Sequence, residues 1–497
     1  MLRVMGLAIV LTLSACGGGG GGGSSPPPVS NPPPPPPPVN NDPTAQQLAS
    51  AAALLDRATF GATFAQIDQV ARTGEAAWLD AQFAAPITRH MPLVEGYIAT
   101  YGLDPNAQPF PGVYRRFAFW ERALTASDQL RQLTAYALTQ IFVVSDNVDA
   151  IVIDPRALAS YYDMLLENSF GNYRDLLRDV TLHPAMGFYL SHVNNGKSDP
   201  VANTFPDENY AREVMQLFSI GLFELNADGS RVLDGDGDPV PTYDNVVIRE
   251  FSKIFTGLSY GTETVGGGSF FGNLTPVMYV PMEMFDAFHE PGEKRLLNGV
   301  VVPDGGSGIE DIDQAIDNLF NHPNVGPFIG KQMIQRLVTS NPSPAYVARV
   351  SATFADNGAG VRGDMGAVVR AILTDAEASN GIRLREPLRR YIALNRSLQA
   401  RGEDGTLPGL GFTAQFLTQQ HVLSAPSVFN FYLPDFAPAG AIKDAGLVSP
   451  DFQIVNDSTI IGGVNLTAFA LFSEASLDSP EDFTRIVPDL GELSVVA

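Results

Sequence analysis

The chain has 497 residues, of which 45% are hydrophobic and 17% are charged, and it carries a formal net charge of −23. This composition is that of a globular protein, but so acidic a surface excludes nucleic acid as an expected partner, because nucleic-acid binding depends on lysine and arginine contacts to phosphate. The charge also disfavours general adhesion to anionic lipid, and the single cysteine leaves no partner for an internal disulfide.

That cysteine, Cys16, closes a predicted signal peptide over residues 1–16. Arg3 precedes a short apolar run, residues 5–13, and small residues then lead to the cysteine. The run is too short to span a bilayer as a helix, and this order is typical of a secretory signal. A cysteine at the cleavage point is typical of a bacterial lipobox. The sequence therefore predicts a lipoprotein anchored through Cys16 in the cell envelope, at the outer membrane or cell surface; the alternative is a plain signal peptide that contains a cysteine.

Residues 17–43 predict a disordered tether. Seven glycines at 17–23 are followed by proline runs at 26–28 and 32–38. Glycine-rich chain is flexible, whereas polyproline is extended at ~3.1 Å per residue. The proline-rich part would hold the body roughly 50–60 Å from its anchor.

Residues 44–470 predict a single, mainly α-helical body. Apolar residues recur there at spacings of three and four, which is the pattern of amphipathic helices. Glycine and proline separate the periodic segments. We expect helices over residues 51–55, 67–70, 76–83, 130–144, 161–170, 173–180, 208–222, 245–258, 312–320, 325–338, 346–354, 365–373 and 387–398.

Strand signals are few, at residues 277–280 and 300–302. Residues 259–273 are glycine-rich and predict a loop. The segment 223–310 is where two lobes would meet if the body is divided, and residues 471–497 form a C-terminal tail of weak periodicity.

The segment 206–218 is the strongest candidate for chemistry. At 100° per residue its apolar side chains fall on one face and predict core contacts: Ala211, Val214, Met215 and Phe218. Its polar side chains gather within about a 100° arc on the opposite face: Asn209, Arg212, Glu213 and Gln216. These donors and acceptors are enough to hold a metal, a sugar or a buried helix. The alternative is a solvated face, in which Glu208 and Arg212 form an i, i+4 ion pair.

Two acidic, glycine-rich turns follow at residues 226–230 and 234–238. Alternating oxygen-bearing side chains in such turns are typical of calcium ligands. The EF-hand spacing is not met, because the sixth residue from Asp234 is Pro239. The alternative is a polar hairpin loop that owes these residues to turn chemistry. The candidate calcium ligands are Asn226, Asp228, Asp234, Asp236 and Asp238.

None of the six histidines has the close spacing of a metal site. His289 and Lys294 share one polar loop and are candidates for acid–base chemistry; the alternative for His289 is a structural role. The sequence has no nucleophile elbow, phosphate loop or dinucleotide fingerprint. The aromatic strip at 427–432 would stack on a sugar ring or pack on the core.

Taken together, these motifs resemble the bacterial family named domain of unknown function 1800. The matching segments are 55–61 with its Arg-Ala-Thr-Phe-Gly string, 209–213 with its Asn-Tyr-Ala-Arg-Glu motif, 242–257, 289–299 and 425–432. The chain departs from the family pattern at Asp207, Leu258 and Glu290. The resemblance runs from about residue 50 to 460. It implies an exported, mainly helical protein, often encoded near a secreted sulfatase-like protein, and it implies no established reaction.

Three functions follow from these observations. The first is an uncharacterised surface-tethered lipoprotein that binds or presents an envelope or secreted partner, with the polar stripe as an internal network. The second is an exported hydrolase or lyase acting on an envelope or extracellular polymer, and the third is a calcium-stabilised structural protein. The site of the hydrolase or lyase would use Glu213 or His289 as the acid–base group and Arg212 for an anionic substrate group, with Asn209, Asp244 and Lys294 beside them.

The arrangement of these side chains distinguishes the first two functions. An open cleft lined by Glu213, Arg212 and His289 would favour catalysis. Side chains that satisfy one another without a cavity would favour binding.

Overall fold

The computed structural model describes residues 42–107, 109–264, 266–272, 276–402, 412–472 and 486–487. The predicted signal peptide, Cys16 and nearly all of the tether lie outside these residues, as does most of the C-terminal tail. The described residues from Pro43 onward form one contact unit, and the division into two lobes near 223–310 stays a prediction.

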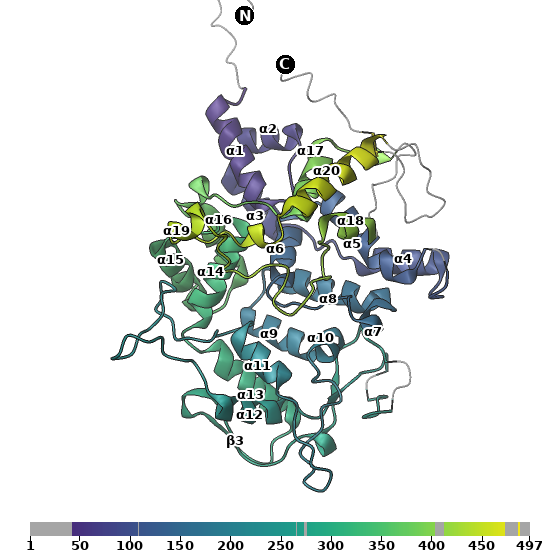
Figure 1. Cartoon of the computed structure of the whole chain (residues 1–497), viewed down its shortest axis with the longest axis vertical. Helices are drawn as coiled ribbons and strands as arrows, with labels where there is room; N and C mark the ends of the chain where they lie inside the picture. Colours follow the sequence, from purple (N-terminus) through teal and green to yellow (C-terminus); the bar gives the residue numbers. More distant parts are fainter. Residues whose placement is uncertain are drawn as a thin grey trace, which may run out of the picture. The chain divides into compact units, whose positions relative to one another are not determined.

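The first half of the body is built from helices, as the sequence predicts (Figure 1). Polar caps mark several of their starts; Thr44 and Thr63 each form a capping box with a glutamine three residues on. The helices are α1 (Ala45–Ala58), α2 (Phe64–Thr73), α3 (Glu75–Ala84), α4 (Met91–Tyr101), η1 (Pro111–Val113), α5 (Tyr114–Thr125), α6 (Gln129–Thr139), α7 (Asp149–Val152), α8 (Pro155–Asn168), α9 (Tyr173–Leu182) and α10 (Pro184–Tyr189).

The middle of the chain combines two helices with short strands and loops. Strand β1 pairs antiparallel with β2, and β3 with β4. The elements are α11 (Asn209–Gln216), α12 (Asn245–Ile254), β1 (Leu258–Ser259), β2 (Glu283–Met284), η2 (Asp286–Phe288), β3 (Lys294–Arg295), η3 (Leu297–Gly299) and β4 (Val301–Val302). The strand predicted at 300–302 is therefore confirmed, whereas residues 277–280 form none. Pro276 and Pro281 flank that segment and lack the N–H that a ladder needs.

The second half is again helical. Its elements are α13 (Gly308–Phe320), α14 (Val325–Leu337), α15 (Pro344–Ala355), α16 (Met365–Thr374), η4 (Ala378–Asn380), α17 (Pro387–Ser397), β5 (Arg401–Gly402), α18 (Phe412–Thr418), α19 (Ala441–Asp444), η5 (Pro450–Gln453), α20 (Asp457–Phe472) and β6 (Ile486–Val487). Strands β5 and β6 pair antiparallel.

One hydrophobic core joins these parts and runs from Ala51 in α1 to Leu466 in α20. Helices distant in sequence meet in it: α14 packs on α6, and α17 packs on α5. Nearly every side chain of α14 is buried, the charged Arg336 included. Among the helices of the described ranges, none has both the length and the apolar character of a bilayer span.

Two helices end earlier than predicted, and both ends shape the site. Helix α6 stops at Thr139 rather than at residue 144. A tight turn follows, in which the N–H of Ile141 donates to the carbonyl of Leu138, and further on the N–H of Asp146 donates to the carbonyl of Leu423. Helix α11 stops at Gln216 rather than at residue 222. The N–H groups of Ile220 and Gly221 both donate to the carbonyl of Met215, which closes the helix end.

Candidate functional site

Asp244 and His289, two of the residues predicted to form a catalytic site, lie at opposite ends of α12. Asp244 caps the start of this helix, where its Oδ1 accepts from the N–H groups of Val246 and Val247. His289 contacts Thr256, just beyond the other end. Ten helical residues separate the two ends by roughly 15 Å, so the structure does not bring Asp244 together with His289 and Lys294.

His289 and Lys294 belong to a buried charged cluster whose third member is Asp311. His289 Nδ1 lies 2.9 Å from the carbonyl oxygen of Thr256, to which it donates, and His289 Nε2 lies 3.0 Å from Asp311 Oδ2. Lys294 Nζ donates to the same Asp311 oxygen at 2.6 Å and lies 3.3 Å from His289 Nε2. All three side chains are at most 6% exposed. The two predicted residues are thus satisfied by a common carboxylate and by backbone.

Asp311 was missed by the sequence analysis, although its position carried a signal. It lies in the first turn of α13, on the face that buries Ile312, Ala315 and Ile316. A carboxylate on an apolar face predicts a buried partner, because an unpaired buried charge is costly.

The predicted polar stripe of α11 is divided between solvent and the interior. Arg212 pairs with Glu208 at 3.3 Å, and both side chains are about 40% exposed; this is the surface ion pair of the alternative interpretation. Asn209 is exposed. The four residues of the apolar face are confirmed as core, since all are fully buried: Ala211, Val214, Met215 and Phe218.

Glu213 is the buried member of the stripe. Its Oε2 has no hydrogen-bond partner among the described residues, and the hydroxyl of Tyr243 has none either. The two groups interact electrostatically, because besides burial the charge of Glu213 contributes to a raised pKa of Tyr243. Burial raises the pKa of Glu213, while the charge of Arg212 opposes the rise. Burial also raises the pKa of Tyr243 to about 12. The structure places Glu213 next to Arg212 and Tyr243 and away from the charged cluster of His289, Lys294 and Asp311.

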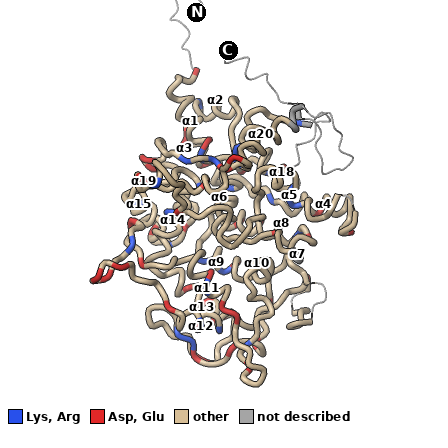
Figure 2. Tube along the Cα trace, viewed as in Figure 1, with Lys and Arg blue, Asp and Glu red and all other residues tan. Residues whose placement is uncertain are grey.

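The two acidic turns form a polar hairpin loop that projects from the body, where acidic positions gather in Figure 2. Asp234 Oδ1 accepts from the N–H groups of Asp236 and Asp238, and Asp228 Oδ1 accepts from Ser230. These bonds give the acidic residues a role in the turns. The described residues contain no group of three or more His, Cys, Asp or Glu arranged to hold a metal. Calcium binding by these residues, Asn226 included, stays a prediction.

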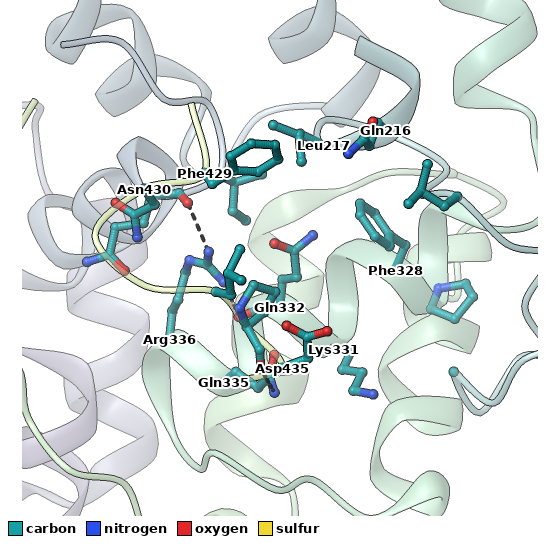
Figure 3. Close-up of a pocket in the computed structure, with 18 of the residues that line it drawn as sticks. Gln216, Leu217, Phe328, Lys331, Gln332, Gln335, Arg336, Phe429, Asn430 and Asp435 are labelled. Atoms are coloured by element: carbon teal, nitrogen blue, oxygen red, sulfur yellow. Dashed lines mark hydrogen bonds between the residues drawn. The ribbon is translucent and has the colours of Figure 1, made fainter. Parts of the chain in front are cut away.

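A pocket of about 390 Å³ opens between the end of α11, helix α14 and the segment 428–435, and we call it the α11/α14 pocket (Figure 3). None of the predicted catalytic residues lines it. It also reaches the hairpin loop through Leu222, Leu225 and Arg231. The residues labelled in Figure 3 all line it: Gln216, Leu217, Phe328, Lys331, Gln332, Gln335, Arg336, Phe429, Asn430 and Asp435.

Two amide side chains of this pocket have unused hydrogen-bonding capacity. Gln332 is 9% exposed and Asn430 is 7% exposed. Neither Gln332 Nε2 nor Asn430 Nδ2 has a partner within the described chain. In Figure 3 the amide of Gln332 lies between the rings of Phe429 and Phe328. Buried polar groups normally have partners, so these two amide nitrogens are unsatisfied within the described chain.

The walls of the pocket are held by contacts of their own. Arg336 Nη2 donates to the carbonyl of Gln140 at 2.9 Å, the bond drawn in Figure 3, and Arg336 Nη1 donates to the carbonyl of Gln332 at 3.4 Å. Burial lowers the pKa of Arg336. Gln335 Nε2 donates to the carbonyls of Ser340 and Pro434, which holds the segment 428–435 on α14.

The chain belongs to the family described as a protein of unknown function, DUF1800, whose model matches residues 53–493. This finding confirms the resemblance drawn from the sequence motifs. Comparison with curated proteins and with solved structures gives no match.

Proposed function

We propose that the protein is a lipid-anchored, non-catalytic binding protein of the bacterial cell envelope, which holds an envelope or secreted partner at the end of its tether. One observation carries the choice of binding over catalysis. The predicted acid–base residues His289 and Lys294 both bond to Asp311 in a buried cluster, and His289 also bonds to a backbone carbonyl. The α11/α14 pocket, in contrast, has amide and apolar side chains in its lining.

The anchor and the partner come from the sequence. Cys16 in its lipobox context would carry the acyl chains, and two acyl signals give stable membrane attachment. The secreted sulfatase-like protein that the family resemblance implies is the first partner to test. The acidic surface suits a soluble body held away from an anionic membrane.

The test uses the full chain expressed with its leader in a bacterial host fed an alkyne-labelled fatty acid. We expect label on the wild-type protein, recovery in the membrane fraction, and loss of both in Cys16→Ser. Crosslinking on intact cells followed by affinity capture should then recover a partner with the wild-type chain but not with Cys16→Ser. An unlabelled wild-type protein in the cytosol would contradict the proposal.

The exported hydrolase or lyase remains a second candidate because of Glu213. A buried carboxyl with a raised pKa and an unpartnered oxygen is suited to general acid chemistry. Turnover of an envelope polymer that is lost in Glu213→Gln, at unchanged stability, would support this candidate. Turnover that persists in Glu213→Gln would show that Glu213 is not the acid–base group of such an enzyme.

A further inference from the structure

The α11/α14 pocket combines aromatic rings with amide side chains. Phe328 and Phe429 present rings on two sides of the space, and the amide of Gln332 stands between them (Figure 3). Gln216 and Asn430 add two further amides to the lining. A pocket of about 390 Å³ falls in the size range of small-ligand sites, which are mainly apolar with a few placed polar groups.

The polar groups of this pocket match hydroxyl groups. An amide side chain offers a donor and an acceptor side by side, and a hydroxyl likewise donates and accepts. The buried amides of Gln332 and Asn430 have no partner in the described chain, so they can bond to a ligand without breaking a bond of the fold. If one of these amides is replaced by an apolar side chain, the ligand hydroxyl that it would bond is left buried without a partner.

The aromatic groups match the other feature of a sugar ring, its C–H faces. An aromatic face carries negative partial charge and attracts polarised C–H groups. Phe429 is 47% exposed, so its ring is accessible to a ligand in the pocket. Rings beside amides therefore suit a molecule that is apolar on its faces and hydroxylated at its edges.

The net charge of the chain favours an uncharged sugar over a polyanionic one. The guanidinium of Arg336 is already bonded to the carbonyls of Gln140 and Gln332. Arg231 and Lys331 bring two further positive charges to the lining, and Asp435 brings one negative charge. The chain as a whole carries −23, which repels a polyanion at long range.

We propose that the α11/α14 pocket binds an uncharged sugar residue of a glycan. Gln332 and Asn430 bond to its hydroxyl groups, and Phe328 and Phe429 pack on its C–H faces. The inference deepens the proposed binding function and rests on it, because it names the chemical class of the partner.

The test is saturation-transfer NMR on the full chain with a panel of defined hexasaccharides. The uncharged members are cellohexaose, laminarihexaose, mannohexaose, xylohexaose and chitohexaose, and the acidic members are hexagalacturonate and hexamannuronate. We expect transfer to at least one uncharged member and to neither acidic one. Gln332→Leu and Phe429→Ala should each weaken that Kd by about tenfold or more, the effect of losing one hydrogen bond or one ring contact.

A control variant and a stability measurement test whether the loss of binding is specific to the pocket. Phe205→Ala removes another phenylalanine, 71% exposed and outside the pocket, and should leave the Kd within about twofold. Gln332→Leu removes an amide that bonds to nothing in the described chain, so its melting temperature should equal that of the wild type. Binding by the wild type that neither pocket variant weakens would overturn the site.

Failure of this inference differs from failure of the proposed function. Binding to the acidic members only, or to no member, overturns the inference that the pocket binds an uncharged sugar. Envelope capture by the wild-type chain would then still support the proposed binding protein. Loss of both glycan binding and envelope capture overturns both.

Discussion

The buried charged cluster of His289, Lys294 and Asp311 and the α11/α14 pocket use polar residues in opposite ways. In the cluster, Lys294 lies 2.6 Å and His289 lies 3.0 Å from the same oxygen of Asp311, and all three side chains are buried. In the pocket, the buried amides of Gln332 and Asn430 lack partners in the described chain. The cluster joins its three side chains by internal bonds, although Asp311 Oδ1 has no partner in the described chain, whereas the two pocket amides make no bond of this kind.

This difference shows that a chemically rich sequence motif can supply internal contacts of the fold. His289 and Lys294 lie in a family motif, yet their partners are internal. The pocket is built from an amide of α14 and rings on two segments that no motif singled out as catalytic. The four substitutions below test the contrast.

The largest effect is expected where the cluster loses its anion. Asp311→Ala leaves the ammonium of Lys294 buried without its partner, and breaking a buried pair typically costs about 3–5 kcal/mol. Urea unfolding should report this loss in the free energy of unfolding. Glu167→Gln is the control, because it breaks an exposed pair with Arg89 and should cost less than about 1 kcal/mol. Equal losses in the two variants would mean that the cluster does not stabilise the fold.

The pH dependence of His192 tests how α11 is held against the core. The ring stacks on Tyr210 of α11 and lies 2.8 Å from the carbonyl of Thr181, and burial lowers the pKa of His192 to about 4. An unfolded histidine titrates near 6.5. Between these values the unfolded state binds the extra proton, so this stabilisation is complete above about pH 6.5 and is lost as pH falls.

His192→Gln isolates that contribution. Between pH 6.5 and 4.5 the wild type should lose about 2–3 kcal/mol of unfolding free energy relative to the variant, at about 1.4 kcal/mol per pH unit. Asp163, whose pKa burial raises to about 6, acts with the opposite sign but is present in both proteins and cancels. Parallel pH profiles for the two proteins would show that His192 is not buried as described.

Gly221 tests the closure of α11 at the pocket wall. Its φ is +72°, and a Cβ there would lie 2.9 Å from Phe328 Cε2. Gly221→Ala should cost about 2 kcal/mol, because the backbone strain and the clash add. Gly358 has a φ of +89° and open space around it. Gly358→Ala therefore introduces backbone strain without a clash and should cost less. A Gly221 variant as stable as the Gly358 variant would contradict the contact with Phe328.

Asp244 gives the smallest expected effect. If it serves as the cap of α12, Asp244→Ala should cost about 1 kcal/mol, while Asp244→Ser, which also caps, should cost little. Thermal unfolding of the two variants measures the difference. A serine variant as unstable as the alanine variant would argue for another role of this carboxylate.

Much of the fold follows from local sequence. The apolar face of α11 was predicted residue by residue, because helical periodicity alone places Val214 and Met215 in the core. Helices α4 and α5 were not predicted. The buried face of α5 includes Arg115 and Arg116, which pair with Asp146, so charged residues conceal its apolar stripe.

The site could be predicted only in pieces. Gln216 and the aromatic strip at 427–432 were both noted as able to meet a sugar, but nothing local brings them together. Their meeting depends on the early end of α11 and on Gln335, which bonds to the carbonyl of Pro434 99 residues away in sequence. Asp311 likewise lies 22 residues from His289, beyond the reach of any helical spacing.

The most direct test of the contrast is one glycan titration, followed by saturation-transfer NMR, on two proteins: Gln332→Leu and the double variant Lys294→Met with Asp311→Leu. Replacing both charges by apolar groups is often neutral for stability, so the double variant should fold and keep the wild-type Kd, while Gln332→Leu should lose binding. Binding that is lost in the double variant and kept in Gln332→Leu would contradict the account, because the charged cluster would then be the site.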